Sequence, residues 1–166
     1  AIPESVDAVF HVAGNTGMWS KMNDQQFQDN VIGTRNMLEV AHQKNAKRFI
    51  NTSSISAYGH HVNEFDETVE SNAISSQIHY CQTKYLAELE VDKAIERGLD
   101  AVLVNPCDIM GPYDSHNWAQ MIQAVYNNDV PGIPPGNAII CHVRDIAQAH
   151  ISAYEKGRTG ERYLLG

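Results

Sequence analysis

Short apolar segments alternate with helix-length segments along this chain, and this alternation limits the possible folds more than any other feature. Residues 6–13 and 100–105 are largely apolar, and residues 47–52 contain the apolar pair Phe-Ile. Between them, residues 23–45 and 75–97 carry apolar residues near helical spacing. Near-continuous apolar strands separated by helices are typical of a parallel sheet with helices on both faces. The sequence therefore predicts a doubly wound, mostly parallel α/β fold of the Rossmann type.

The rest of the chain continues the alternation. Residues 118–128 and 143–156 are predicted helices, and residues 138–142 and 161–165 are predicted strands. A chain of 166 residues is long enough for one domain with a sizeable core. We therefore expect a single domain over residues 1–166.

Composition excludes several classes of partner. The formal net charge of -8 argues against nucleic acid or an anionic lipid surface as a main partner. No apolar run approaches the ~20 residues that cross a bilayer, so we expect no membrane association. Three cysteines without metal-type spacing favour a reducing, cytoplasmic location. The eight histidines show no metal-binding pattern, so no metal site is predicted.

Tyr80 and Lys84 lie four residues apart in the predicted helix 75–97. At this spacing the two side chains share one helix face. A lysine ammonium beside a phenol favours the phenolate, so we expect it to lower the pKa of Tyr80 from its usual value near ~10. Such a pair is also common on solvated helix faces, so the pair alone does not predict a site.

Polar residues follow three of the predicted strands, at residues 11–14, 52–54 and 105–108. In an open parallel sheet, the carboxyl ends of the strands share one edge, where ligands bind. A serine hydroxyl at this edge can hold a substrate oxygen while a tyrosine transfers its proton. We therefore expect these segments and the Tyr-Lys pair to form one site.

The chain resembles the extended short-chain dehydrogenase/reductase family, in the branch of dihydroflavonol-reductase-like and epimerase/dehydratase-like proteins. Matching segments run through almost the whole chain, in the order of the family. They are F-H-V-A-G (10–14), N-V-I-G-T-R-N-M-L-E-V-A (30–41), R-F-I-N-T-S-S-I-S-A-Y-G (48–59), Y-C-Q-T-K (80–84), N-P-C-D-I-M-G-P (105–112), H-V-R-D-I-A-Q-A-H (142–150) and G-E-R-Y-L-L-G (160–166).

This resemblance implies a role for each catalytic residue. Tyr80 would be the acid/base on the reacting oxygen. Lys84 would lower the tyrosine pKa and bind the nicotinamide ribose. Ser54 would be the catalytic serine, with Ser53 as the alternative.

The resemblance also implies binding of NADP or NAD. Ala13 and Gly14 would line the adenosine and phosphate side, and Pro106 and Ile109 would meet the carboxamide. Asn30 would be mainly structural, joining a helix to the sheet. The full set of expected cofactor-binding residues is Ala13, Gly14, Thr52, Ser53, Tyr80, Lys84, Pro106 and Ile109.

Two parts of the family pattern are missing from this sequence. The opening glycine-rich phosphate loop is absent, and we do not interpret residues 14–17 (G-N-T-G) as that loop because no apolar helix follows them. The chain also stops at Gly166, before the family's C-terminal substrate region. We therefore expect the sequence to be the central portion of a longer protein, and we expect this portion to bind NAD(P) poorly by itself. The residues that select NAD or NADP lie in the absent segment.

The predicted function is an NAD(P)-dependent carbonyl reductase or alcohol dehydrogenase acting on a small molecule. Asn105 stands where sugar-nucleotide enzymes often carry arginine, which favours the reductase side. The alternatives are a sugar-nucleotide epimerase/dehydratase and a non-catalytic nucleotide-binding sensor or scaffold. The expected pocket walls are Met18, Trp19, His79, Met110, Tyr113 and Trp118, and Cys81 and Cys107 are expected to be structural.

The resemblance also implies assembly. In the family, helices corresponding to residues 23–45 and 75–97 pair across a two-fold axis. We therefore expect a homodimer formed through these helices.

Overall fold

The computed structural model describes residue 3, residues 5–132 and residues 138–166, so parts of the predicted span 1–166 lie outside the described residues. Four strands form a parallel sheet: β1 (Ala8–His11), β2 (Arg48–Thr52), β3 (Ala101–Pro106) and β6 (Arg162–Leu165), in that spatial order. The mostly parallel Rossmann-type sheet expected from the sequence is confirmed.

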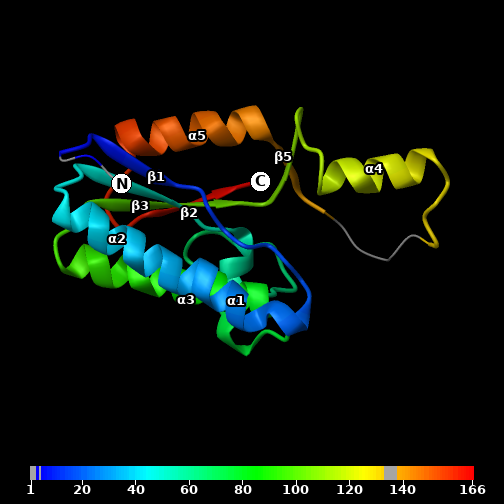
Figure 1. Ribbon diagram of the computed structural model, residues 1–166, viewed down its shortest axis with the longest axis horizontal. Helices are drawn as coiled ribbons and strands as arrows, with labels where there is room; N and C mark the ends of the chain where they lie inside the picture. The colour runs from blue at the N-terminus through cyan, green and yellow to red at the C-terminus, as the bar shows by residue number, and fades with distance from the viewer. Residues whose placement is uncertain (1–2, 4, 133–137) are drawn as a thin grey trace.

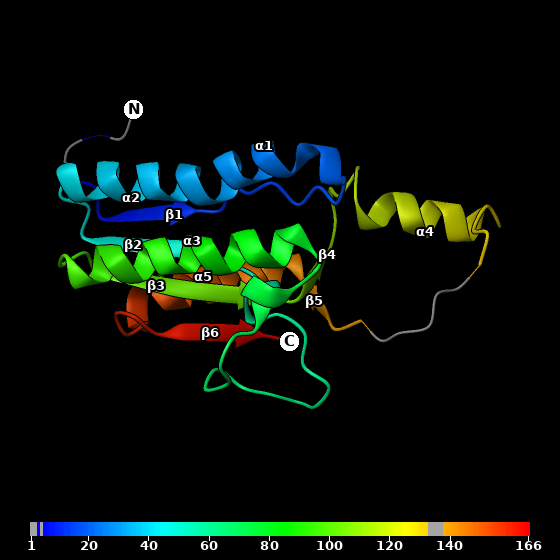
Figure 2. The same ribbon diagram turned by 90° about the horizontal axis from the view of Figure 1, so that it is seen from below.

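Helices cover both faces of this sheet (Figure 1). On one face, α1 (Asn23–Phe27), a π-helical segment (Gln28–Ile32) and α2 (Gly33–Gln43) form one continuous rod. Helix α3 (His79–Glu96) lies beside this rod, and Figure 2 shows the two side by side. On the opposite face, α5 (Val143–Lys156) packs against β2 and β3.

The core is correspondingly divided into two layers. Because side chains alternate along a strand, β2 sends Phe49 to one face and Ile50 to the other. Phe49 lies among residues of α2, α3, the strands and the loop before β3, which are Val9, Leu38, Ala41, Val91, Ala94, Leu99, Ala101 and Leu103. Ile50 lies among residues facing α5, which are Val102, Val104 and Ala153. All six residues of β3 are buried, so this strand is the centre of the domain.

Beyond shifts of one or two residues at the ends of several elements, the structure differs from the sequence expectation at two places. The predicted helix 75–97 begins at His79, because residues Ala73–Ser75 form a separate 3-10 turn and Ser76 is extended. Two short strands, β4 (Asp108–Met110) and β5 (Ile140–His142), pair in parallel as a small second sheet. Only β5 was expected.

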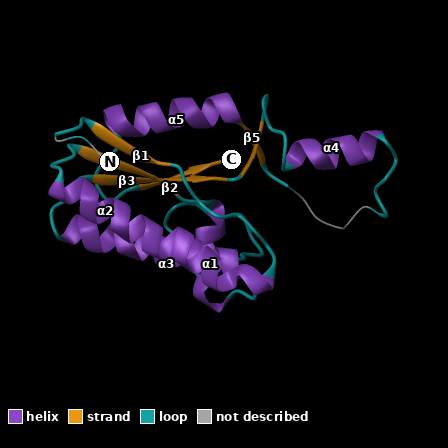
Figure 3. Ribbon diagram, in the orientation of Figure 1, coloured by secondary structure: helices purple, strands orange, loops and turns teal. Residues whose placement is uncertain are grey.

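Helix α4 (Trp118–Tyr126) extends away from the body of the domain, as Figures 1 and 3 show. None of its residues is buried. Its exposed large apolar side chains are Met121, Ile122, Val125 and Tyr126. Within the described ranges, we find no helix of the length and apolarity needed to cross a membrane.

Candidate active site

The serines expected in the site follow directly from β2. Ser53 donates its backbone N–H to the Val104 carbonyl at 2.7 Å, which extends the pairing of β2 with β3. Ser54 is extended and begins the 3-10 helix Ile55–Tyr58, labelled η3 below. Its hydroxyl oxygen accepts the backbone N–H of Ser56 at 3.1 Å. The end of the sheet thus sets the position of both serines.

Tyr80 and Lys84 approach the same edge from α3. Lys84 is buried, and its Nζ donates to the Thr52 carbonyl at 2.9 Å. Tyr80 is half-buried and lines the same cavity as Ser54, whose side chain lowers the pKa of the phenol. The helix therefore places its phenol and its ammonium against the last residues of β2.

These side chains line one cavity of about 430 Å³ at the carboxyl ends of the strands. Of the residues expected to act in catalysis or cofactor binding, all but Ala13 line it. They are Gly14, Thr52, Ser53, Ser54, Tyr80, Lys84, Pro106 and Ile109. Ala13 is exposed and lies outside the lining, although its neighbours Val12 and Gly14 line the cavity.

Burial changes the acid–base properties of both groups on α3. The pKa of Tyr80 is raised, chiefly because burial disfavours the phenolate, while the hydrogen bond from Ser54 acts in the opposite direction. The expected lowering of this pKa by Lys84 is therefore not seen. Burial also lowers the pKa of Lys84 to about 8, and the Glu88 carboxylate opposes this effect.

Residues 14–17 do not have the properties of a phosphate loop. The backbone N–H of Asn15 donates to Asn30 Oδ1 at 2.7 Å, and the N–H of Gly17 donates to Asn15 Oδ1 at 2.9 Å. Gln26 also holds the carbonyls of both Asn15 and Gly17. A phosphate loop needs free N–H groups at a helix start, so the structure supports the interpretation made from the sequence.

Asn30 has a structural role, as expected, but its partners differ from those expected. Its Nδ2 donates to the Asn15 carbonyl at 2.9 Å and to the Thr83 hydroxyl at 3.1 Å. Asn30 therefore joins the rod formed by α1 and α2 to α3 and to the segment after β1, rather than to the sheet.

Comparison with known proteins places this arrangement in a family. The model of the NAD dependent epimerase/dehydratase family matches residues 1–166. The chain belongs to this family. Its fold is that of the extended short-chain dehydrogenases/reductases, and the expected cofactor class, a nicotinamide dinucleotide, is confirmed at the level of the family.

Two curated relatives within this group are named as reductases. The chain is 32% identical to a Synechocystis sp. protein named "Putative dihydroflavonol 4-reductase", over 98% of this chain and 50% of that protein. It is 30% identical to cinnamoyl-CoA reductase 1 of Petunia hybrida, over 95% of this chain and 50% of that protein. The chain thus spans about half the length of these curated relatives.

A solved structure shows the same architecture. The crystal structure of gox2253 superposes with a TM-score of 0.89 at 33% identity, covering 98% of this chain and 51% of that one. The expected dihydroflavonol-reductase-like and epimerase/dehydratase resemblance is therefore confirmed.

The cavity offers buried polar groups to a ligand. Lys84 is a buried cation at the cavity wall, with the Thr52 carbonyl as the one acceptor that its Nζ has among the described residues. Ser53 Oγ is buried and has no hydrogen-bond partner in the described part of the chain. Spare donors on buried groups suit a ligand rich in hydroxyl and amide oxygens.

A second cavity of about 710 Å³ adjoins the first and shares Ile55, Ser56, Cys107 and Asp108 with it. It is lined further by His60, His61, Phe65, Ile78, Ile139 and others. Among the expected pocket walls, Met18 and Trp118 line the first cavity. Trp19, His79, Met110 and Tyr113 line neither cavity, and Tyr113 is 97% exposed.

Several lining residues were missed by the sequence analysis, although most lie next to residues that were named. They are Thr16, Ile55, Ser56 and Asn117. Val12, Cys107 and Asp108 also line the cavity, and they belong to the segments 11–14 and 105–108 that were expected to form the site. The described residues contain no group of His, Cys, Asp and Glu able to hold a metal ion. Burial raises the pKa of the Cys107 thiol to about 11, as suits a structural cysteine.

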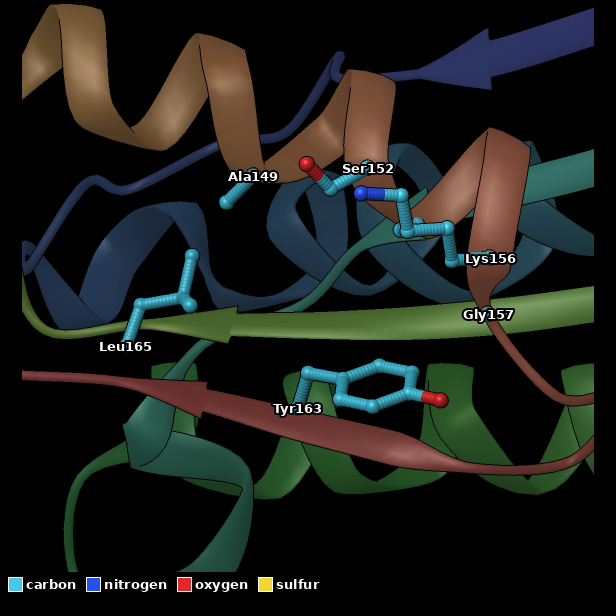
Figure 4. A pocket seen from close by; sticks show the side chains of 7 residues that line it. Ala149, Ser152, Lys156, Gly157, Tyr163 and Leu165 are labelled. Atoms are coloured by element: carbon cyan, nitrogen blue, oxygen red, sulfur yellow. The ribbon is translucent and has the colours of Figure 1, made fainter.

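A separate cavity of about 250 Å³ lies between α5 and β6 (Figure 4). Its wall combines apolar side chains with Ser152, Lys156 and Tyr163. None of the expected site residues lines it.

Proposed function

We propose that the protein is an NAD(P)-dependent oxidoreductase that interconverts a carbonyl compound and its alcohol. In this proposal Tyr80 is the acid/base, Ser54 orients the reacting oxygen, and Lys84 binds the nicotinamide ribose. One observation carries the proposal: Ser54, Tyr80 and Lys84 line one cavity at the carboxyl ends of the strands, where the Ser54 side chain influences the pKa of the phenol.

The raised pKa of Tyr80 favours the reductive direction. A phenol with a raised pKa stays protonated at neutral pH, so it can donate its proton to a carbonyl oxygen. Ser54 is held beside it and can donate a second hydrogen bond to the same oxygen. In the oxidative direction Tyr80 must first lose its proton, so we expect that direction to need higher pH.

The residues that would hold the cofactor are those around Lys84. Its ammonium and the unpartnered Ser53 hydroxyl would meet hydroxyl or amide oxygens, and Pro106 and Ile109 line the same cavity. A bound NAD(P)H supplies a hydride to the carbonyl carbon. The chain's own part is to hold the carbonyl oxygen and to donate the proton that this oxygen takes up.

An epimerase/dehydratase would use the same three residues with no net consumption of cofactor. The curated relatives that share 30–32% identity are named as reductases, and this supports the reductase assignment. The amount of NAD(P)H consumed per product distinguishes the two reactions. A non-catalytic sensor or scaffold would bind nucleotide without turnover of any carbonyl compound.

The direct test is Tyr80→Phe in the full-length protein. Because the phenol is the proton donor, kcat should fall ~10²–10⁴-fold, the usual contribution of a general acid. The dissociation constant for NAD(P)H should change little, because the ribose contact belongs to Lys84. Stopped-flow turnover and calorimetric titration would measure the two quantities.

Tyr85→Phe is a matched control. Tyr85 lies on the same helix, is half-buried and does not line the cavity, so kcat should be unchanged. Retention of more than about a tenth of kcat by Tyr80→Phe would refute the acid/base assignment.

A further inference from the structure

A buried polar chain runs from the backbone of Ser54 into the interior of the domain. Asn105, near the end of β3, has no exposed surface. Its Nδ2 donates to the Ser54 carbonyl at 3.1 Å and to Glu88 Oε1 at 2.6 Å. The Ser54 carbonyl also accepts the backbone N–H of Ala57 at 3.0 Å, so this peptide group is held from two sides.

Glu88 continues the chain through a second carboxylate oxygen. It is 3% exposed, and its Oε2 accepts from Arg162 Nε at 2.8 Å. Arg162 is the first residue of β6, and its Nη2 also donates to Asp92 at 2.8 Å. The chain of contacts therefore connects α3, β3 and β6 to the residue that begins η3.

The feature of Asn105 that matters at this position is its pair of side-chain N–H donors, not the packing of its side chain. Both hydrogen bonds of its amide come from Nδ2, whereas Oδ1 is buried without a partner among the described residues. An unpartnered buried acceptor is unfavourable, and an apolar residue of similar size would avoid it. The two N–H groups are thus the feature that the fold retains.

Residues of a single helix, α3, reach Ser54 by two routes. Tyr80, Lys84 and Glu88 succeed one another at four-residue intervals along α3, so they share one face of the helix. Through Asn105, Glu88 fixes the Ser54 peptide, while Tyr80 meets the Ser54 hydroxyl directly. One helix therefore sets both the phenol and the serine that must face it.

We propose that Glu88 and Asn105 are positioning residues that hold Ser54 against Tyr80 for catalysis. This inference rests on the proposed function, because it assigns Ser54 a part in turnover. The competing explanation is that Glu88 and Arg162 form an ion pair that stabilises only the fold. The two explanations differ in one respect: a positioning residue loses its effect on kcat when Ser54 has no hydroxyl to position.

The test is a set of double-mutant cycles with Ser54→Ala. Asn105→Leu removes both donors at similar volume, and Glu88→Gln removes the carboxylate with little change of shape. Each single variant should lower kcat about tenfold, and Asn105→Leu should leave the KM for NAD(P)H unchanged. In the Ser54→Ala background each should lower kcat less than about twofold, since coupled residues are not additive. If Asn105→Leu does not fold, Glu88→Gln still tests the proposal.

Glu90→Gln is the matched control. Glu90 is a buried carboxylate on the same helix, and its ion pairs are with Arg35 and Lys93 rather than with Asn105 or Arg162. Loss of the Glu90 carboxylate should lower the melting temperature without changing kcat. This variant therefore shows how turnover responds to a loss of stability alone.

The outcomes separate the two proposals. If Ser54→Ala leaves kcat at the wild-type value, the proposed function is wrong and the positioning inference fails with it. If Ser54→Ala lowers kcat, but Asn105→Leu and Glu88→Gln lower it by equal factors in both backgrounds, only the positioning inference is overturned. Loss of their effect in the Ser54→Ala background confirms it.

Discussion

Lys84 illustrates the desolvation penalty of placing a cation in the wall of a cavity. Its side chain is buried, and its Nζ donates one hydrogen bond to the Thr52 carbonyl. Desolvation disfavours the charged form, which is why the pKa of Lys84 falls from 10.5 to about 8. Such a penalty lowers the stability of the fold at neutral pH, and the proposed role of Lys84 in cofactor binding gives a reason for retaining it.

We therefore predict that Lys84→Met abolishes turnover and stabilises the fold at pH 7. Between pH 8 and 10.5 the unfolded chain binds more protons at Lys84 than the folded chain, so wild-type stability rises with pH across this window. The advantage of Lys84→Met, about 1–2 kcal/mol at pH 7 after the lost hydrogen bond is allowed for, should shrink towards pH 10. Urea unfolding at several pH values measures it. A variant less stable than wild type at pH 7 would contradict this account.

At the residue scale, the sequence predicted well which segments come together in one cavity. It predicted the pKa values of the residues in that cavity less well. Motif spacing placed Ser54, Tyr80 and Lys84 at one edge of the sheet, and the structure brings them into one cavity. The expected effect of Lys84 on the tyrosine pKa failed, because that pKa depends mainly on burial. Burial is a property of the assembled fold, and the i, i+4 spacing does not contain it. For the same reason, the link from Asn105 to Glu88 was not visible in the sequence.

At the element scale, salt bridges join the rod formed by α1 and α2 to α3. Arg35 binds Glu90 through Nε at 2.8 Å and Nη2 at 3.1 Å, and Lys93 adds a third contact at 2.8 Å. These partners lower the pKa of Glu90 from 4.5 to about 2. Because Arg35 is half-exposed, solvent weakens the pair.

We predict that Glu90→Gln lowers the free energy of unfolding by about 1 kcal/mol at pH 7. A carboxylate whose folded pKa is depressed stabilises the fold above its unfolded pKa, and this contribution is lost as pH falls. The difference from wild type should therefore be constant above pH 4.5 and vanish as the pH approaches 2. Chemical denaturation at graded pH measures it. A difference that persisted at pH 2 would show that packing, not charge, is responsible.

The elements themselves were largely predictable, and the misses have physical causes. The periodicity of apolar residues in the longer segments predicted the strands of the main sheet and the helices that cover it. Helix α3 begins later than expected because the Ser76 hydroxyl accepts the Ile78 backbone N–H at 3.0 Å, which stabilises an extended start. Strand β4 was missed because three residues carry too little periodicity, and its partner β5 lies far along the chain.

At the scale of the whole molecule, the expected homodimer stays a prediction, and the structure weakens one of its arguments. None of the exposed large apolar side chains in the described residues lies on α2 or α3. The outer surfaces of these helices carry ion pairs such as Arg97 with Glu39. Sedimentation of the full-length protein at micromolar concentration should give a dimer mass. Arg97→Glu should then weaken association, because it would place two acidic groups together at the interface. A monomer throughout would exclude this assembly.

Stability should also be unevenly distributed over the molecule. Strand β3 is buried at all six positions, whereas α4 buries none of its residues and extends away from the sheet. Segments with few buried contacts open locally, far below the free energy of global unfolding. We therefore predict that the amides of residues 118–126 exchange with deuterium orders of magnitude faster than those of residues 101–106.

Mass spectrometry of the two corresponding peptides at neutral pH measures this contrast. The α2 and α3 peptides serve as internal references, because these helices pack on the sheet. Protection of α4 equal to that of β3 would contradict the prediction. Since nothing within the described residues buries Met121, Ile122 or Val125, such protection would require a covering surface from another segment or another molecule. Loss of this protection on dilution would then identify the cover as a separate molecule, because only intermolecular contacts depend on concentration.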